Sequence, residues 1–569
     1  MNREVRQDLS VDVVVVGSGT GMAAALAASE AGLSVIVVEK TELFGGSTAR
    51  SGGAIWIPGN PALRRQGGAI PRAQTDRYLE SVVSGSAPSE RYGAFLDHGP
   101  AAVAMLERTT ALKFRWMRGY PDYFPNEPGG NGAGSSCEAE PFDINRLGDQ
   151  KCCLRPSDVE SPLPMPVTGA DYKWLNLIMR TPAKSISIAA KRLLQGVWGA
   201  MAGRKLVTGG QAIAAGMLDG LLRAGVPCLN GTRVVDLIHN QGRVTGVIAE
   251  RDGAQFRINA TCGVVLAAGG FDHNMDMRAQ YQSASLVDDV SLGARGNVGE
   301  GILMGKRAGV GLASMDQAWW YPTVKPVKGY PPIVLADRSL PGSFMINSRG
   351  RRFVNEAESY MAFGQRVLEL EQRGQPVGQM WMVFDQQYRN SYLMAASIPP
   401  RKKLPSDWYQ AGIVVEADTP ADLAAAMHVP QQVFFSEFCH YNEMATSGVD
   451  SDFSRGDSAY DRYYGDPTIA PNPNLRPLAG KLFAVQFVLS DLGTCGGLTA
   501  DANAVAMRND GTPMDGLYVI GNNAANAFGA AYPGAGATIG QGITFGYIAV
   551  QHMLSSSSSK AAIASGALE

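Results

Sequence analysis

The chain has 569 residues, of which 45 % are hydrophobic and 18 % are charged, and its formal net charge is −2 at pH 7. A chain of this length exceeds what one hydrophobic core usually supports, so we expect at least two domains. The balanced charge and the lack of a basic patch argue against nucleic acid as a partner. Seven scattered cysteines exclude a disulfide framework, and six histidines without ligand spacing predict no metal site.

The sequence predicts neither a signal peptide nor a transmembrane helix. Residues 1–10 are polar and charged, and no run of about 18 apolar residues occurs. The cysteine usage fits a reducing compartment, so we expect a cytoplasmic protein. Ser555–Glu569 is rich in serine and alanine and is expected to be a frayed tail.

The N-terminal residues predict a dinucleotide-binding βαβ unit. A strand, a glycine turn, a helix and a second strand are expected at Val11–Val16, Gly17–Gly21, Met22–Ala31 and Ser34–Val38. Such glycines let the backbone approach a pyrophosphate at the positive end of the helix. In dinucleotide-binding units an acidic residue that binds the ribose hydroxyls follows the first glycine by roughly 20 residues, and Glu39 stands at this spacing from Gly17. Met22 stands where a third glycine is usual, which would leave helix–strand packing to Ala23 and Ala24.

Three further glycine-rich segments favour FAD over NAD. They are Phe44–Gly53, Val264–Gly270 and Gly516–Asn522, the last of which precedes a helix expected at Thr538–Val550. Segments so far apart can enclose one long cofactor only if both ends of the chain share a domain. We therefore predict an α/β fold in which residues 1–317 and 490–569 form a Rossmann-like FAD-binding domain. Residues 318–489 would form an inserted α+β catalytic domain that caps the substrate.

The residues expected to bind FAD lie in these segments and their immediate surroundings. They are Gly17, Ser18, Gly19, Gly21, Glu39, Lys40, Gly45, Gly46, Ser47, Thr48, Ser51, Gly52, Gly53, Val235, Ala268, Gly269, Gly521, Asn522, Ala537 and Ile539.

Four motifs resemble the flavoprotein family of fumarate reductases and 3-ketosteroid dehydrogenases, and the likeness spans essentially the whole chain. They are Pro121–Tyr123, Arg352–Tyr360, Ser490–Thr494 and Tyr532–Gly536. The last is a Tyr-Pro-Gly-x-Gly loop of the kind that characterises steroid Δ1-dehydrogenases. The resemblance implies an FAD enzyme of steroid degradation that introduces the C1–C2 double bond of 3-ketosteroids and passes electrons to an external, quinone-like acceptor.

The same resemblance implies roles for four residues. The Tyr532 hydroxyl and the Gly536 amide would bind the C3 oxygen. Tyr360 would remove the C2 proton while the C1 hydride moves to N5 of FAD, and Tyr123 would lie beside Tyr360. A free phenol has a pKa of about 10, so a tyrosine base needs a stabilised phenolate.

Other tyrosines and tryptophans of the chain have weaker claims to a place in the site. Tyr120 and Tyr321 are the alternative candidates for the catalytic tyrosines, while Trp319 and Trp320 are expected to form an apolar wall.

Several alternatives stay open. The enzyme could act at another ring bond of a ketosteroid, or reduce enoates as fumarate reductases do. Fumarate reductases, however, carry a histidine just before the threonine that matches Thr494, where this chain has Gly493. No arginine and histidine clamps for a dicarboxylate are evident. Phe44–Gly53 also lacks the His-Thr pair of covalent flavoproteins, so FAD is expected to be non-covalent. A non-catalytic flavin-binding or membrane-adaptor protein is disfavoured because the tyrosine set is intact.

Tyr172–Leu206 resembles an insertion and contains no acidic residue. Its basic residues are Lys173, Arg180, Lys184, Lys191, Arg192, Arg204 and Lys205. From Ile186 to Met201 apolar residues recur at helical spacing, with Trp198 among them. This pattern indicates a helix at the inner face of a membrane. The alternative is a helix that packs on the FAD domain or on a second subunit. The oligomeric state remains open, and inserted length at 130–206 would border the substrate mouth.

Overall fold

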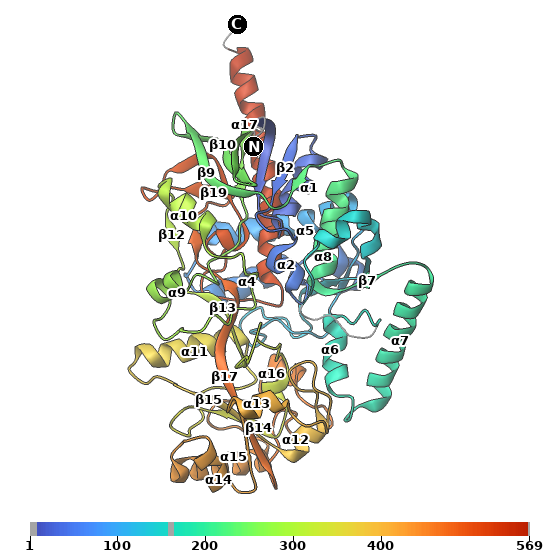
Figure 1. The fold of residues 1–569 in the computed structure, drawn as a ribbon, viewed down its shortest axis with the longest axis vertical. Helices are drawn as coiled ribbons and strands as arrows, with labels where there is room; N and C mark the ends of the chain where they lie inside the picture. Colours follow the sequence, from blue (N-terminus) through green and yellow to red (C-terminus); the bar gives the residue numbers. More distant parts are fainter. Residues whose placement is uncertain (1–7, 158–163, 567–569) are drawn as a thin grey trace.

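The computed structural model describes residues 8–157 and 164–566. Two β-sheets organise it, and they lie one above the other in Figure 1. The larger sheet has the order β19-β20-β11-β1-β2-β8, and β10 and β9 continue from β11. Its strands are β1 (Leu9–Val16), β2 (Val35–Val38), β8 (Cys228–Leu229), β9 (Arg233–Asn240), β10 (Arg243–Arg251), β11 (Ala254–Leu266), β19 (Val505–Met507) and β20 (Pro513–Val519).

The middle of the larger sheet is parallel and buried. β1 pairs in parallel with β2 and β11, and β11 pairs in parallel with β20. Both faces of β1 are covered, so both must be apolar, and Val13 to Val16 are buried. Helices α1 (Gly21–Glu30) and α17 (Ala537–Gly566) pack on one face of these strands, with α5 (Ser89–Thr109) and α8 (Gly209–Arg223) packed against them. Side chains of β9, β10 and α10 (Glu300–Arg307) cover the other face. The predicted βαβ unit and the α/β class are confirmed.

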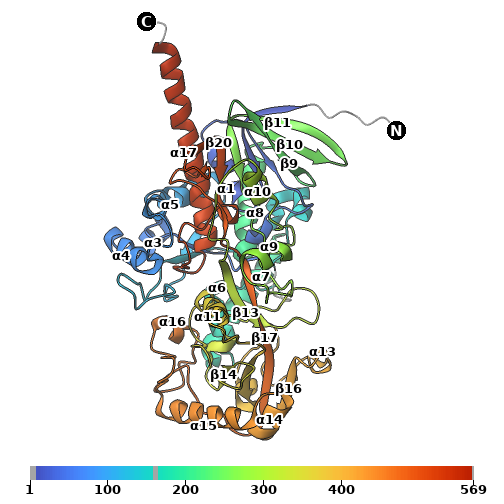
Figure 2. The same cartoon turned by 90° about the vertical axis from the view of Figure 1, so that its left-hand side faces the viewer.

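The C-terminal tail differs from its prediction. Helix α17 continues to Gly566 and extends beyond the body of the molecule in Figures 1 and 2. The serine and alanine run contains no glycine or proline before Gly566, and alanine has the highest helix propensity, so the helix propagates. Residues 567–569 of the expected tail lie outside the described residues.

The smaller sheet has the order β13-β17-β15-β14, with β16 also paired to β17. Its strands are β13 (Ala318–Val324), β14 (Ser343–Ile346), β15 (Met380–Asp385), β16 (Val414–Ala417) and β17 (Leu482–Thr494). Nearby helices are α11 (Tyr360–Gln372), α12 (Gln386–Ser391), α13 (Ser406–Gln410), α14 (Pro420–Ala426), α15 (Gln431–Ser447) and α16 (Ala459–Tyr463). Strand β17 runs through position 490 without a break.

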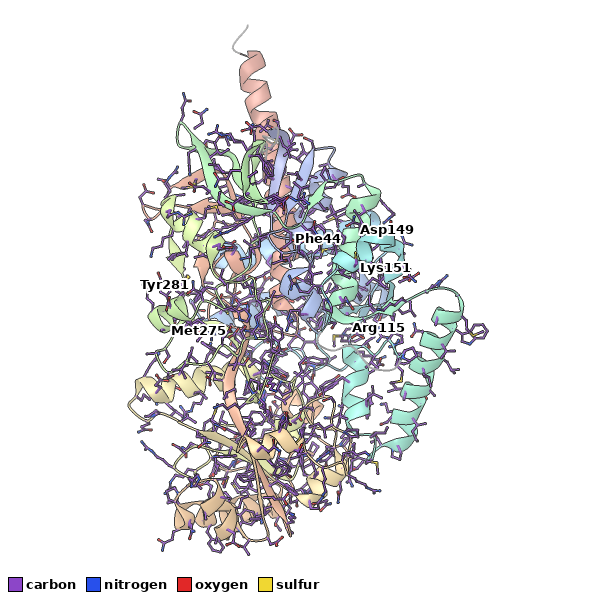
Figure 3. All side chains as sticks on the ribbon, viewed as in Figure 1. Phe44, Arg115, Asp149, Lys151, Met275 and Tyr281 are labelled. Atoms are coloured by element: carbon purple, nitrogen blue, oxygen red, sulfur yellow. The ribbon has the colours of Figure 1, made fainter. Side chains whose placement is uncertain are left out.

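The remaining strands lie outside these two sheets and are two to four residues long. The short strands are β3 (Ala54–Trp56), β4 (Phe114–Trp116), β5 (Ser136–Ala139), β6 (Phe142–Asp143), β7 (Leu206–Val207), β12 (Leu312–Ala313) and β18 (Gly497–Leu498). The other helices are α2 (Gly46–Arg50), α3 (Pro61–Gln66), α4 (Arg72–Val83), α6 (Gly169–Asn176), α7 (Pro182–Met201) and α9 (Met275–Tyr281). Arg115, labelled in Figure 3, ties the start of α6 to the body through bonds to Glu138 and Thr168.

Helix α7 lies at the edge of the molecule (Figure 1), and its large apolar residues are exposed. Trp198 is 67 % exposed and Met201 is 74 % exposed. The inward face is instead small and polar, with Ser185, Arg192, Gly196 and Gly199 buried. Arg192 is held by an ion pair of 2.7 Å with Asp171 of α6. The large apolar residues of α7 are thus exposed among the described residues, and its small and polar face packs on α6.

Among residues 8–157 and 164–566, no helix is both long and apolar enough to cross a membrane. Within the same ranges, no group of His, Cys, Asp or Glu side chains is arranged to hold a metal ion.

Candidate active site

A cavity of about 790 Å³ lies between the two halves of the molecule, and both halves contribute to its walls. All four expected catalytic residues, Tyr123, Tyr360, Tyr532 and Gly536, line it. The expected FAD residues on its walls are Gly17, Ser18, Gly19, Glu39, Lys40, Gly46, Ser47, Thr48, Ser51, Gly52, Gly53, Ala268, Gly269, Gly521, Asn522 and Ile539. The sequence therefore brings its predicted cofactor and catalytic residues to one cavity.

The glycine turn after β1 leaves room for a ligand at the N-terminus of α1. Gly17 has φ +105°, and a Cβ there would lie 2.3 Å from the carbonyl oxygen of Ala267. Gly21 does not line the cavity; a Cβ at this position would lie 2.9 Å from side-chain atoms of Val15 and Ala267. Gly21 thus provides the close helix–strand contact that a third glycine usually provides, which explains why the buried Met22 is tolerated.

Glu39 is held rigidly at the end of β2. One carboxylate oxygen accepts bonds from the Ser18 amide and hydroxyl, at 3.2 and 2.7 Å. The other accepts bonds from the Thr41 amide and hydroxyl, at 2.9 and 2.8 Å. These four bonds fill the roughly four acceptor sites of the carboxylate, so a ribose hydroxyl would bind Glu39 by replacing the bond from the Ser18 or the Thr41 hydroxyl. Its neighbour Lys40 pairs with Glu300 at 2.5 Å.

The loop after Glu39 forms α2 and a second wall of the cradle. The Ser47 hydroxyl accepts bonds of 2.9 Å from the Ala294 amide and from Asn297 Nδ2. Gly53 has φ +73°, and a Cβ there would lie 2.0 Å from the carbonyl carbon of Gly209. These close approaches, together with the helix N-terminus and the ordered acid, fit a dinucleotide.

Four expected FAD residues do not line the cavity. Besides Gly21, these are Gly45, Val235 and Ala537. Gly45 donates its amide to the Ser18 hydroxyl at 3.0 Å, so it supports the cradle from behind. In β9 it is Arg233 and Val234, the first two residues of the strand, that line the cavity. Ala537 is buried at the start of α17.

Several residues of the cavity wall carry no signal that predicts them from the sequence. They include Arg50, Arg155, Thr208, Gly209, Arg233, Leu292 and Asn297. The β-bridge between Phe44 and Leu154 brings the neighbouring Arg155 to the cavity. The Gly210 amide donates a hydrogen bond to the Ser51 carbonyl, which brings the neighbouring Gly209 there. Such pairings over long sequence separations leave no local pattern. The exception is the Thr208-Gly209-Gly210 turn before α8, whose glycines are a local signal.

A cluster of buried tyrosines forms the other end of the cavity. The hydroxyl oxygens of Tyr123 and Tyr360 lie 2.7 Å apart. The ring centroid of Tyr532 lies 5.0 Å from that of Tyr123 and 5.6 Å from that of Tyr360. Tyr123 follows β4, Tyr360 begins α11, and Tyr532 precedes α17, so three distant segments converge here.

The loop that carries Tyr532 and Gly536 is held by its proline. The Pro533 carbonyl accepts bonds from the Tyr123 amide at 3.1 Å and from the Tyr78 hydroxyl at 2.6 Å. Gly536 has φ +89°, and a Cβ there would lie 2.0 Å from the Ala54 carbonyl oxygen. Thr538 donates to the Tyr532 hydroxyl at 3.3 Å. The loop thus places a phenol and an unhindered backbone amide on the same wall.

Burial raises the pKa of Tyr360 well above its usual value, and its hydrogen bond with Tyr123 opposes this effect. Tyr360 is also the first residue of α11, where the positive end of the helix favours a phenolate. Burial likewise raises the pKa of Tyr532, which keeps its hydroxyl a proton donor.

The two tryptophans do not form the expected apolar wall. Trp319 and Trp320 are buried but do not line the cavity, whereas Tyr321 does. Trp319 packs behind Tyr532 with ring centroids 4.5 Å apart. Other residues make the apolar wall, and they come from the segment after β4, from α6 and the residues before it, and from loops of the smaller sheet: Met117, Met165, Val167, Leu175, Ile333, Leu335 and Leu393.

A histidine at the position before Thr494 would be strained, because the backbone there has a positive φ that favours glycine. Gly493 has φ +129°, and a Cβ there would lie 2.6 Å from Asn522 Nδ2. The Thr494 hydroxyl accepts a hydrogen bond from the Phe271 amide at 3.0 Å, so this threonine supports the backbone.

The two alternative candidates for the catalytic tyrosines have other hydrogen-bond partners. The Tyr321 hydroxyl accepts a hydrogen bond from the Val334 amide at 2.9 Å, and the Tyr120 hydroxyl accepts one from Tyr464.

The sequence matches the family described as FAD binding domain over residues 12–539. It is 42 % identical to a 3-oxosteroid 1-dehydrogenase of Mycolicibacterium smegmatis, over 95 % of this chain and 96 % of that protein. It is also 42 % identical to a 3-oxosteroid 1-dehydrogenase of Mycobacterium tuberculosis, over 95 % and 98 %.

The fold is similar to the crystal structure of 3-ketosteroid Δ1-dehydrogenase from Sterolibacterium denitrificans in complex with 1,4-androstadiene-3,17-dione. The TM-score is 0.89 at 33 % identity, with 96 % of this chain and 100 % of that chain covered.

The cavity and these matches define an FAD-dependent oxidoreductase. The chain belongs to the family of FAD-binding flavoproteins that contains the 3-oxosteroid 1-dehydrogenases.

Proposed function

We propose that the protein is a 3-ketosteroid Δ1-dehydrogenase, which removes one hydrogen each from C1 and C2 of a 3-ketosteroid. The observation that carries this proposal is the Tyr123–Tyr360 hydroxyl pair, which shares one cavity with the Tyr532–Gly536 loop and the FAD cradle. The names of the relatives support it. We also propose that residues 1–317 and 490–569 hold FAD without a covalent bond, and that residues 318–489 cap the steroid.

Each residue has one task in this reaction. The Tyr532 hydroxyl and the Gly536 amide donate hydrogen bonds to the C3 oxygen, which makes the C2 proton more acidic. Tyr360 takes that proton, and Tyr123 donates a hydrogen bond to the Tyr360 oxygen. The residues of the FAD cradle would hold FAD, which would supply the acceptor for the C1 hydride and would deliver the electrons to an external, quinone-like acceptor.

The proposal is tested by anaerobic mixing of the FAD-loaded protein with 4-androstene-3,17-dione. We expect the flavin absorbance to bleach and the product to be a 1,4-diene, which mass spectrometry and NMR distinguish from dehydrogenation at another ring bond. Succinate is the matched negative substrate. Bleaching by succinate, or a product unsaturated elsewhere, would refute the proposal.

We further propose that the protein binds the surface of a membrane through α7. Lys184 and Lys191 flank the outward apolar face, and the Lys184 ammonium lies 3.2 Å from the centroid of the Trp174 ring. An apolar face flanked by lysines fits an anionic lipid surface. Leu175 and Tyr172 of the neighbouring α6 line the cavity, so this surface lies beside the steroid-binding wall. A steroid dissolved in the lipid would then be close to the cavity.

Flotation with vesicles that contain phosphatidylserine tests this placement. We expect the wild type to float and a Leu194→Glu/Trp198→Glu variant to stay in the dense fraction, with flotation reduced by about tenfold or more. Phe435→Glu, on the exposed surface of α15, is the matched control and should float like the wild type. Equal flotation of all three, or a wild-type dimer that the double variant dissociates, would contradict membrane binding.

A further inference from the structure

A tyrosine of the smaller half contacts two arginines of the FAD-binding half. The guanidinium carbon of Arg50 lies 3.5 Å from the centroid of the Tyr330 ring, and that of Arg295 lies 4.6 Å from it. Arg50 is the last residue of α2, Arg295 lies between α9 and α10, and Tyr330 follows β13. Because a guanidinium group is attracted to the face of an aromatic ring, the two contacts stabilise one position of Tyr330.

Both arginines are held in place by other groups. Arg50 is 7 % exposed and donates a hydrogen bond from Nε to the Leu292 carbonyl at 3.1 Å. Arg295 forms an ion pair of 2.7 Å with Asp289, and its side chain is 46 % exposed. Neither guanidinium has to be ordered when it meets the ring, so the contact with Tyr330 costs little side-chain entropy. One arginine is buried and the other reaches the surface, so Tyr330, which lines the cavity, lies near its rim.

Residues 325–336 follow β13 and contain this tyrosine; we call them the strap. The second half of the strap is hydrogen-bonded to β13. The Val334 amide donates to the Tyr321 hydroxyl at 2.9 Å. The Thr323 hydroxyl donates to the Pro332 carbonyl at 2.5 Å. The strap is thus attached to β13 by these bonds and to the FAD-binding half through its tyrosine.

The strap also forms part of the apolar wall of the cavity. Ile333 and Leu335 line the cavity, and so do the two residues that directly follow Tyr330, which are Pro331 and Pro332. Proline restricts its own φ and the conformation of the residue before it, so the backbone between Tyr330 and Ile333 has little freedom. A displacement of Tyr330 therefore displaces the wall against which the steroid is expected to lie.

We propose that Tyr330 is a positioning residue that sets the affinity for the steroid. Its contacts with Arg50 and Arg295 hold the strap against the FAD-binding half, so that Ile333 and Leu335 are in place before the steroid enters. Without these contacts the strap has to be ordered when the steroid binds, and this entropy cost weakens binding. Tyr330 takes no part in proton or hydride transfer. Its role rests on the proposed dehydrogenase function.

Titration of the FAD-loaded protein with 1,4-androstadiene-3,17-dione tests this role, together with bleaching by saturating 4-androstene-3,17-dione. Tyr330→Leu keeps an apolar side chain but removes the aromatic face. We expect it to bind the diene about tenfold more weakly, with a bleaching rate at saturation within about twofold of the wild type. Tyr330→Phe keeps the aromatic face and should bind the diene like the wild type. Tyr281→Leu is the matched control: the Tyr281 ring lies 5.9 Å from the Lys306 ammonium but outside the cavity, so diene binding should not change.

Arg295→Ala tests the contact from its other side, since Arg295 is not among the described residues that line the cavity. We expect it to weaken diene binding about threefold in the wild type and to add no loss in Tyr330→Leu. Unchanged diene binding in Tyr330→Leu would overturn the proposal, and so would a Tyr330→Phe variant that binds as weakly as Tyr330→Leu. A wild type that binds the diene but is not bleached by 4-androstene-3,17-dione would refute the dehydrogenase function separately, because the diene affinities are measured without turnover.

Discussion

Replacing Tyr360 by phenylalanine is expected to lower kcat for steroid 1,2-desaturation by about 10² to 10⁴-fold, the usual contribution of a positioned general base. The variant loses the hydroxyl that lies 2.7 Å from Tyr123 but keeps the ring that packs against Tyr532. FAD content and steroid binding should therefore persist. Stopped-flow bleaching of the flavin measures the rate, and the spectral change on titration with 1,4-androstadiene-3,17-dione measures binding.

Tyr441→Phe is a suitable control for this variant. Tyr441 is equally buried and donates its hydroxyl to the Ser343 carbonyl at 3.0 Å, but it lies outside the cavity. Its loss should reduce the free energy of unfolding by about 1 kcal/mol and leave kcat unchanged. If Tyr360→Phe bleaches at a rate similar to the wild type, Tyr360 is not the base.

Gly17→Ala is expected to yield a protein with less than about a tenth of the wild-type FAD content, because the added methyl group and a positive φ both oppose the native turn. The methyl group would lie 2.3 Å from the Ala267 carbonyl oxygen, so either β11 or the turn must move. Both border the space for the pyrophosphate. The ratio of absorbance at 450 and 280 nm in the purified protein measures the FAD content.

Gly32→Ala provides the comparison at the other end of α1. Gly32 also has a positive φ, +77°, but a Cβ there meets nothing within 4 Å. It should cost about 1 kcal/mol of stability and leave the FAD content unchanged. Equal FAD loss in both variants would show that the effect arises from backbone strain and not from the contact with Ala267.

The sequence predicted those parts of the cofactor cradle that follow local rules. Glycine spacing, the β-branched strand and Glu39 are contiguous signals, and the structure places them together. Asn297 and Arg155 reach the cavity through long-range pairing, for which a single sequence contains no signal. The register of β13 determines which of its aromatic side chains face the cavity, and only the fold sets that register. The prediction that Trp319 forms part of the cavity wall was therefore wrong.

The insertion shows a related limit. Helical spacing correctly grouped the apolar residues of α7 on one face. It could not show whether that face points inward or outward, because the answer depends on Arg192 pairing with Asp171 of another helix. The catalytic tyrosines were found through motif resemblance, since no periodicity distinguishes them from the chain's other tyrosines.

Strands β13 and β17 connect the two halves of the molecule as an antiparallel pair, from Ala318 opposite Thr494 to Val324 opposite Phe487. Helix α11, which begins with Tyr360, packs on this pair, where a Cβ at Gly364 would lie 2.2 Å from the Cβ of Trp320. Paired strands resist bending far better than single linkers, because rotation of one half would break ladder hydrogen bonds. The geometry between Tyr360 and the Tyr532 loop is therefore set when the protein folds. Less of the steroid's binding energy is then needed to order the site, and more remains to orient the ring for reaction.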